Sequence, residues 1–245
     1  MTLCTLLVKS EKYGKICLAC LDESRRWIRP IKPGGFMETD IIMDNGNMMD
    51  IFDVVDMKFG SPFPIKHHTE NMTFVSEGGI KFVKTLSETK KSALLQEVTN
   101  SRLFDNVETK YELYDEIINL GRSLVLVGPI ASFDIGYEDN HPRLWIVGKN
   151  NCEFDIPCTD LKFCAFIKSK LADFEKNPLP FINSQDIAEL KDKQIYFVIG
   201  LTGDSLDENG EIRSGKYAPV GSSIEPRYWP MVVGVLTIPT YFEGE

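Results

Sequence analysis

Apolar and polar residues alternate along the first part of the chain in the manner of β-strands. The apolar stretches Thr2–Lys9 and Lys15–Leu21 are separated by a polar turn that ends in Gly14, and this arrangement predicts a β-hairpin. The same alternation runs through Arg25–Ile31 and Met49–Phe59, so we expect two further strands. The opening of the sequence therefore predicts a β-rich unit.

The pattern changes to a helical period in the middle of the chain. Residues 60–80 contain several Gly and Pro residues and predict a loop with short extended pieces. Ser87–Val98 has apolar residues on one side at helical spacing, which predicts a helix. Val107–Leu120 predicts a second helix, and Gly121 is a plausible stop signal after it.

Strand-like alternation resumes after Arg122. Six strands are expected in this half: Ser123–Ile130, Ser132–Tyr137, Arg143–Gly148, Cys152–Ile156, Ile195–Leu201 and Met231–Ile238. Between them, Asp160–Phe174 repeats its apolar residues at spacings of three and four, and Thr159 or Asp160 can cap the resulting helix. Asp186–Asp192 predicts a short helix.

The order of these elements predicts a mainly β (α+β) fold in two small units. The spacing is too irregular for alternating β-α units, and glycines within or at the ends of strands fit sharply bent small barrels. We expect one unit at 1–120, with a helical insertion near 60–120, and a second at 121–245, with a helix over 159–174. The pattern Arg-x-Trp-Ile occurs once in each half, at Arg25–Ile28 and at Arg143–Ile146, which favours a duplication.

Composition narrows the class of protein. The chain has 245 residues, of which 43% are hydrophobic and 26% charged, as in ordinary globular proteins. Because no run of 18 or more apolar residues occurs, we expect no transmembrane helix. The N-terminal apolar run has no basic segment ahead of it, so it does not predict a signal peptide. These features predict a cytoplasmic protein without membrane contact.

The net charge of -9 argues against general binding of nucleic acid, but it is unevenly distributed. Residues 1–33 contain seven basic and three acidic side chains, a net charge of +4, and the remainder carries -13. A basic segment on an acidic protein predicts a local binding surface, although such lysines often only solvate strand ends.

No metal, cofactor or catalytic site is predicted. Cys17 and Cys20 form a C-x-x-C pair, but strand alternation places them on opposite faces, so they cannot share an ion. The six cysteines are therefore expected to be reduced and mostly buried. The pair His67-His68 is expected to be exposed, and the carboxylates between Glu38 and Asp56 to be solvated. We predict a non-enzymatic protein.

Several segments together resemble the dual OB-containing domain family, proteins found in bacterial mobile-element and conflict loci. The resemblance starts with the hairpin strand Lys15–Cys20 and the strand Arg26-Trp27-Ile28-Arg29-Pro30, which is its most specific part. It continues through Pro142–Gly148, Phe154–Asp160, Ile195–Leu201 and Tyr228–Ile238. It implies two OB-like small β-barrels with helical insertions, and it implies no catalytic residues.

OB folds commonly bind oligonucleotides, which makes the basic opening segment a candidate interface. A strand over Arg25–Ile31 places Arg25, Trp27 and Arg29 on one face, where the ring stacks a base and the guanidinium groups contact phosphate. The same logic applies to the second unit. The candidate nucleic-acid-binding residues are Lys9, Lys12, Lys15, Arg25, Arg26, Trp27, Arg29, Lys32, Arg143 and Trp145.

Three functions stay open at this point. The first is binding of single-stranded DNA or RNA, within a defence or mobile-element system. The second is a protein–protein adaptor or inhibitor that docks a defence or effector complex, which the acidic remainder favours. The third is a metal-dependent nuclease. The alternative for Trp27 is a core residue with solvated arginines beside it, because tryptophan in a strand is usually buried.

Overall fold

The alternating start of the chain forms one long β-hairpin in the computed structural model. Strand β1 (Thr2–Lys12) pairs antiparallel with β2 (Lys15–Asp22), and only Tyr13 and Gly14 connect them. Both have positive φ angles, 53° and 69°, as in the two-residue turns whose twist matches that of the strands. The turn is thus shorter than predicted. The structure describes residues 1–65, 67–100, 103–104, 107–108, 110–138, 141–148, 151–174, 181–201 and 230–240.

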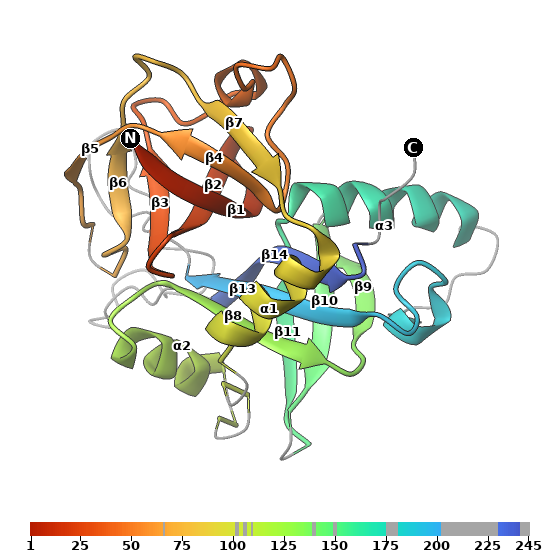
Figure 1. Ribbon diagram of the computed structural model, residues 1–245. Helices are drawn as coiled ribbons and strands as arrows, with labels where there is room; N and C mark the ends of the chain where they lie inside the picture. The colour runs from red at the N-terminus through yellow and green to blue at the C-terminus, as the bar shows by residue number, and fades with distance from the viewer. Residues whose placement is uncertain are drawn as a thin grey trace.

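The first half of the chain builds a curled seven-stranded sheet around this hairpin (Figure 1). Its strand order is β5-β6-β3-β2-β1-β4-β7. The remaining members are β3 (Trp27–Ile31), β4 (Asp53–Met57), β5 (Phe59–Pro62), β6 (Asn71–Phe74) and β7 (Lys81–Thr85), with a 3-10 helix η1 (Glu38–Ile41) between β3 and β4. The concave side encloses an apolar core that includes Cys4, Leu6, Leu18, Cys20, Ile28 and Val55.

Backbone conformation explains where the predicted elements were wrong. Phe52 has a φ of 69°, so the strand predicted over Met49–Phe59 begins only at Asp53. Arg25 has a φ of 62°, so it lies in a turn and β3 starts at Trp27. The short helix predicted over Asp186–Asp192 is instead the end of a 3-10 helix, η2 (Ser184–Asp186), followed by turns.

In the part of the chain that the structure describes, three α-helices flank the sheets. They are α1 (Glu88–Val98), α2 (Lys110–Asn119) and α3 (Leu161–Phe174), close to the helices predicted from apolar spacing. Figure 1 shows α1 in front of the strands where the two halves of the chain meet, with α2 and α3 on opposite sides of the second half. Within the described residues, no helix is both long and apolar enough to cross a membrane.

The second half of the chain forms two antiparallel sheets. One contains β8 (Leu124–Ile130), β13 (Gln194–Leu201) and β14 (Pro230–Ile238) in the order β14-β13-β8. The other contains β9 (Asp134–Glu138), β10 (His141–Val147), β11 (Glu153–Pro157) and β12 (Ile182–Asn183) in the order β11-β10-β9-β12. Side chains of both sheets and of α3 share one core, which includes Phe133, Leu144, Ile156, Phe163, Phe197 and Val232.

A third apolar cluster joins the two halves. It combines Leu7, Ala19 and Trp27 from the first sheet with Leu126, Tyr196 and Val233 from the second half, and Leu95 of α1. The strand β14 approaches β1 so closely that a Cβ atom on Gly234 would lie 3.0 Å from the carbonyl oxygen of Leu7. The mainly β (α+β) fold class is confirmed. The unit boundary near residue 121 lies between α2 and β8 and stays a prediction.

Candidate nucleic-acid interface

Trp27 is part of the core between the two halves. Its residue surface is 8% exposed, and it packs in the cluster that contains Leu126 and Tyr196. The interpretation of Trp27 as an exposed stacking platform is therefore corrected, and the alternative, a core tryptophan, holds. In this structure its ring is not available to a base.

The burial of Trp27 follows from what covers the first sheet. Alternation directs Leu18 and Cys20 of β2 into the first barrel, so Ala19 and Leu21 face outward. These outward side chains contact the cluster contributed by β8, β13 and β14. The face of strands 2 and 3 is the usual oligonucleotide surface of OB folds. Much of it is thus occupied here by the second half of the same chain.

Two of the predicted arginines, which follow the end of β2, form ion pairs with carboxylates. Arg25 donates from Nε to Oε2 of Glu97 on α1 over 2.9 Å, and it lies outside the strand, so the predicted shared face with Trp27 and Arg29 is wrong. Arg26 donates from Nε to Oδ2 of Asp22 over 2.8 Å. The other oxygen of Asp22 accepts the backbone N–H of Arg26, so this pair stabilises the turn.

Arg29 belongs to a buried polar cluster that connects the halves. Its Nη2 lies 3.5 Å from Oε1 of Glu70, and its Nη1 lies 2.6 Å from Nδ1 of His68. The hydroxyl of Ser123, at the start of β8, donates to Glu70 and lies 2.6 Å from His68 Nδ1. Arg29 therefore helps to neutralise a buried carboxylate, to which Arg122 also lies close enough to interact electrostatically.

His68 is buried, so the prediction that the His67-His68 pair is exposed is wrong for this residue. Burial, with the cations Arg29 and Lys12 close by, lowers the pKa of His68 to about 3. Burial also raises the pKa of Cys17, and Arg29 and Lys12 lower it by smaller amounts. His68 is therefore neutral at physiological pH, as an Nδ1 that accepts from Arg29 requires.

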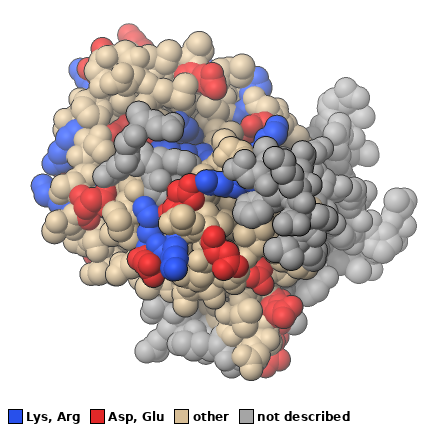
Figure 2. Space-filling model, turned by 90° about the vertical axis from the view of Figure 1, so that its right-hand side faces the viewer, with Lys and Arg blue, Asp and Glu red and all other residues tan. Residues whose placement is uncertain are grey.

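The predicted lysines divide into two groups. Lys32 forms an ion pair with Asp40 over 2.6 Å, and Lys9 donates to the carbonyl oxygen of Met49 over 3.1 Å. Lys12 and Lys15 form no ion pair among the described residues. In the described part of the face shown in Figure 2, Lys and Arg side chains lie next to Asp and Glu side chains, so most charges there are compensated locally.

The tip of the β1–β2 hairpin presents an aromatic ring between two lysines. Tyr13 is 78% exposed, and Lys12 Nζ lies 5.3 Å from the centre of its ring. Lys15 Nζ lies 3.1 Å from the sulfur of Met37, a weak acceptor that leaves its charge available. This tip corresponds to the loop between strands 1 and 2 that OB folds use in ligand binding. We call Lys12, Tyr13 and Lys15 the hairpin site.

The second half keeps its predicted pair on an open sheet face. Arg143 donates to both carboxylate oxygens of Asp155, over 2.5 and 2.7 Å. Trp145 is partly exposed, and its ring meets that of Phe181 edge to face with centroids 4.7 Å apart. The platform predicted for this unit is thus present, but its arginine is neutralised.

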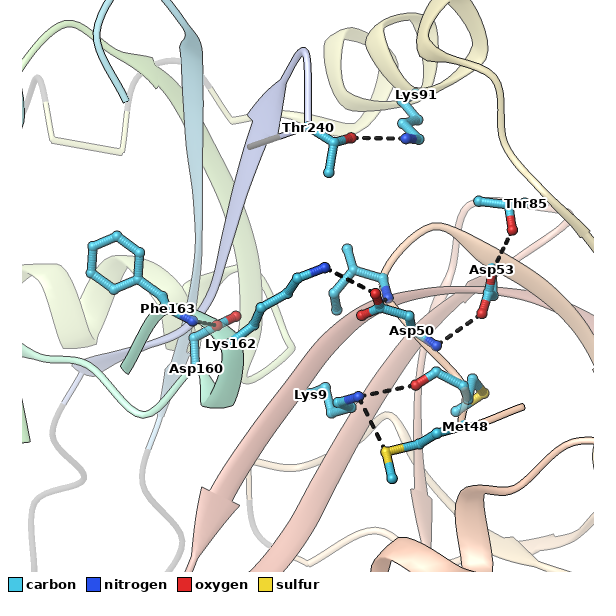
Figure 3. A network of polar contacts seen from close by, with 12 residues as sticks. Lys9, Met48, Asp50, Asp53, Thr85, Lys91, Asp160, Lys162, Phe163 and Thr240 are labelled. Atoms are coloured by element: carbon cyan, nitrogen blue, oxygen red, sulfur yellow. Dashed lines mark hydrogen bonds and ion pairs between the residues drawn. The ribbon is translucent and has the colours of Figure 1, made fainter. Parts of the chain in front are cut away.

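A small cavity of about 150 Å³ lies where the halves meet, and Figure 3 shows its polar network. Lys162, at the start of α3, forms an ion pair with Asp50 of the first half over 2.9 Å. Asp160 accepts the backbone N–H of Phe163 over 2.6 Å and that of Val235 over 3.1 Å. Burial raises the pKa of Asp160 to about 6. The Lys162–Asp50 pair joins α3 to the first half, and Asp160 joins the start of α3 to β14.

The described residues contain no group of three or more His, Cys, Asp or Glu side chains that could hold a metal ion. All six cysteines are free thiols. Cys20 faces the core of the first barrel, whereas Cys17 lies near Arg29, so the prediction that the two point to opposite faces is confirmed.

Sequence reasoning missed two aromatic residues. Tyr13 lies in a two-residue turn, where a side chain has no core to enter, and its position between Lys12 and Lys15 was the available signal. Phe181 precedes the two-residue strand β12, and nothing in the local pattern places it beside Trp145.

Comparison with known families agrees with this architecture. A family model described as a dual OB-containing domain matches residues 3–179. No curated protein is similar enough in sequence to count as a match.

Proposed function

Because the chain belongs to the dual OB-containing domain family, we propose that it binds single-stranded nucleic acid through the hairpin site of its first barrel. The protein acts without catalysis, as a binding module. Its nucleic-acid contacts lie at the exposed end of the first barrel, since the second half covers the outer face of β2 and β3 around Trp27.

The exposure of Tyr13 is the observation that carries this proposal. An aromatic ring that is 78% exposed at a hairpin tip contributes nothing to the core, but it offers a free face to a nucleobase. Lys12 and Lys15 stand on either side of it and supply charges for the flanking phosphates.

Replacing Tyr13 with asparagine tests the stacking role without disturbing the turn. Asparagine adopts positive φ readily, so the hairpin is kept while the ring is lost. We expect Tyr13→Asn to weaken binding of labelled oligothymidylate or oligouridylate by roughly tenfold or more, measured by fluorescence anisotropy at low salt. Tyr13→Phe retains the ring and should bind like the wild type. Equal affinity of the Asn variant and the wild type would contradict the proposal.

Removing a lysine from the hairpin site should act differently. In Lys12→Ala, we expect affinity for all sequences to fall together and the slope of log affinity against log salt to decrease by about one. Lys84→Ala removes an exposed charge from β7 and serves as the control, whose slope should equal that of the wild type. An unchanged slope in Lys12→Ala would show that this amine contacts no phosphate.

The other expectations from the family resemblance remain proposals. We place the protein in a bacterial defence or mobile-element system, in the cytoplasm, where single strands form during replication or transfer. A nuclease activity is the least supported alternative, because the carboxylates in and before β4 are bound to separate partners. Asp53 accepts from Thr85, and Asp50 pairs with Lys162.

A further inference from the structure

The sheet β11-β10-β9-β12 has one face in the core and one face open. Leu144 and Ile146 of β10 point into the core of the second half, so Arg143, Trp145 and Val147 point outward. Val147 is 59% exposed, and Phe181, beside β12, is 47% exposed. The open face thus carries apolar side chains around a central tryptophan, on the surface that OB folds use for ligands.

The indole ring of Trp145 lies across the neighbouring strand. A Cβ atom placed on Gly136 of β9 would come within 2.5 Å of the ring atom Cζ3 and 3.2 Å of Phe181. Only a glycine at this position allows the ring to pack against the backbone of β9 and to contact Phe181. The ring is therefore held in place on one side and retains a partly exposed side.

Carboxylates flank this ring on both sides. Trp145 stands opposite Asp155 on β11 and opposite Asp134 on β9 in the two strand registers. Glu153 lies on the same outer face of β11 and is exposed. Arg143 is the cation at the neighbouring position and is paired with Asp155. Among the described residues, Asp134, Glu153, Asp155 and Arg143 together carry a net charge of -2. A phosphate would be repelled here, whereas a cation would be attracted.

We propose that this face binds a basic segment of a partner protein, with a lysine or arginine side chain of the partner seated on Trp145. The tryptophan ring is the strongest aromatic acceptor for a cation, and the aspartates on either side add charge complementarity. Val147 and Phe181 contact the aliphatic parts of the bound segment. This surface is separate from the hairpin site, so the protein holds nucleic acid and a basic partner at different places.

An oligoarginine peptide is the probe for this surface, measured by fluorescence anisotropy with the full chain. We expect Trp145→Ala to weaken its binding by about twofold to thirtyfold. Trp145→Phe keeps an aromatic ring and should retain most of the affinity. Glu153→Gln removes an exposed charge without touching the core, so it should weaken binding even if Trp145→Ala disturbs the sheet.

Controls separate this site from general attraction to an acidic protein. Glu77→Gln removes an exposed carboxylate from the first half and should leave peptide binding unchanged. Tyr13→Asn should also leave it unchanged, although it impairs oligonucleotide binding. The proposal is overturned if Trp145→Ala and Glu153→Gln bind the peptide as the wild type does, or if Trp145→Ala loses oligothymidylate binding while peptide binding persists.

Discussion

Replacing Trp27 with alanine is expected to lower the free energy of unfolding by about 3–5 kcal/mol, the usual cost of truncating a buried large aromatic residue. Trp27 is 8% exposed and contributes to the cluster that joins the two halves, so the cavity would open at their junction. Urea denaturation followed by circular dichroism measures the loss. A lower midpoint with an unchanged slope would show that stability alone has changed.

Trp145→Ala is the matched comparison, because both tryptophans stand in the pattern Arg-x-Trp-Ile. Trp145 is partly exposed, so its loss should cost clearly less stability than the loss of Trp27. The folded fraction of Trp27→Ala should still bind oligothymidylate, since the hairpin site is unchanged. A Trp27→Ala protein with wild-type stability and impaired oligonucleotide binding would restore the stacking interpretation that burial argues against.

For Asp160→Asn, we expect the change in the free energy of unfolding between pH 4 and pH 7 to differ from that of the wild type by about 2.5 kcal/mol. Asp160 is 1% exposed, and burial raises its pKa from 3.8 to about 6, while Lys162 lowers it and Asp50 raises it by smaller amounts. Between these pH values the folded state holds a proton that the unfolded state has released. Stability from this group is therefore present at low pH and is lost as the pH rises toward 6.

The asparagine variant cannot titrate, so it lacks this gain at low pH. Relative to the wild type, it should be least stable near pH 4 and should recover at pH 7, where the wild type holds a buried charge. His68 acts in the opposite direction, because its pKa falls to about 3 on folding and stability is lost as the pH drops below 6.5. Both proteins contain His68, so its contribution cancels in the difference between their free energies of unfolding, measured with urea at each pH.

Asp160→Ala completes this comparison. It removes both acceptors, and the buried N–H groups of Phe163 and Val235 are then left unpaired, at about 1–3 kcal/mol each. Its loss of stability should therefore exceed that of the asparagine variant at every pH. A difference between wild type and Asp160→Asn that does not vary with pH would show that Asp160 titrates normally in the folded protein.

Local signals predicted much of the fold. The hairpin, α1 and α3 depend on periodicity within a few turns or one strand pair, and the sequence shows that periodicity directly. By contrast, β7 is mostly exposed and polar, so only its pairing with β4 makes it a strand. Such strands carry no alternation that a single sequence reveals.

The candidate interface was harder to predict because charge counting ignores distant partners. Residues 1–33 carry a net charge of +4, but Arg25 pairs with Glu97 and Arg29 with Glu70, far along the chain. Alternation also gave Trp27 and Trp145 equivalent outward positions. Whether an outward face meets solvent or another sheet is decided by tertiary packing, which differs between the two units.

The close approach of β14 to β1 has a consequence for the nascent chain. Leu7 is synthesised 227 residues before Gly234, which packs on its carbonyl group. At synthesis rates of about 5–20 residues per second, β14 is made roughly ten to fifty seconds after β1, so the outer side of β1 stays uncovered for that time. During that interval the apolar side chains around Trp27 face water, and such exposed apolar surface favours aggregation.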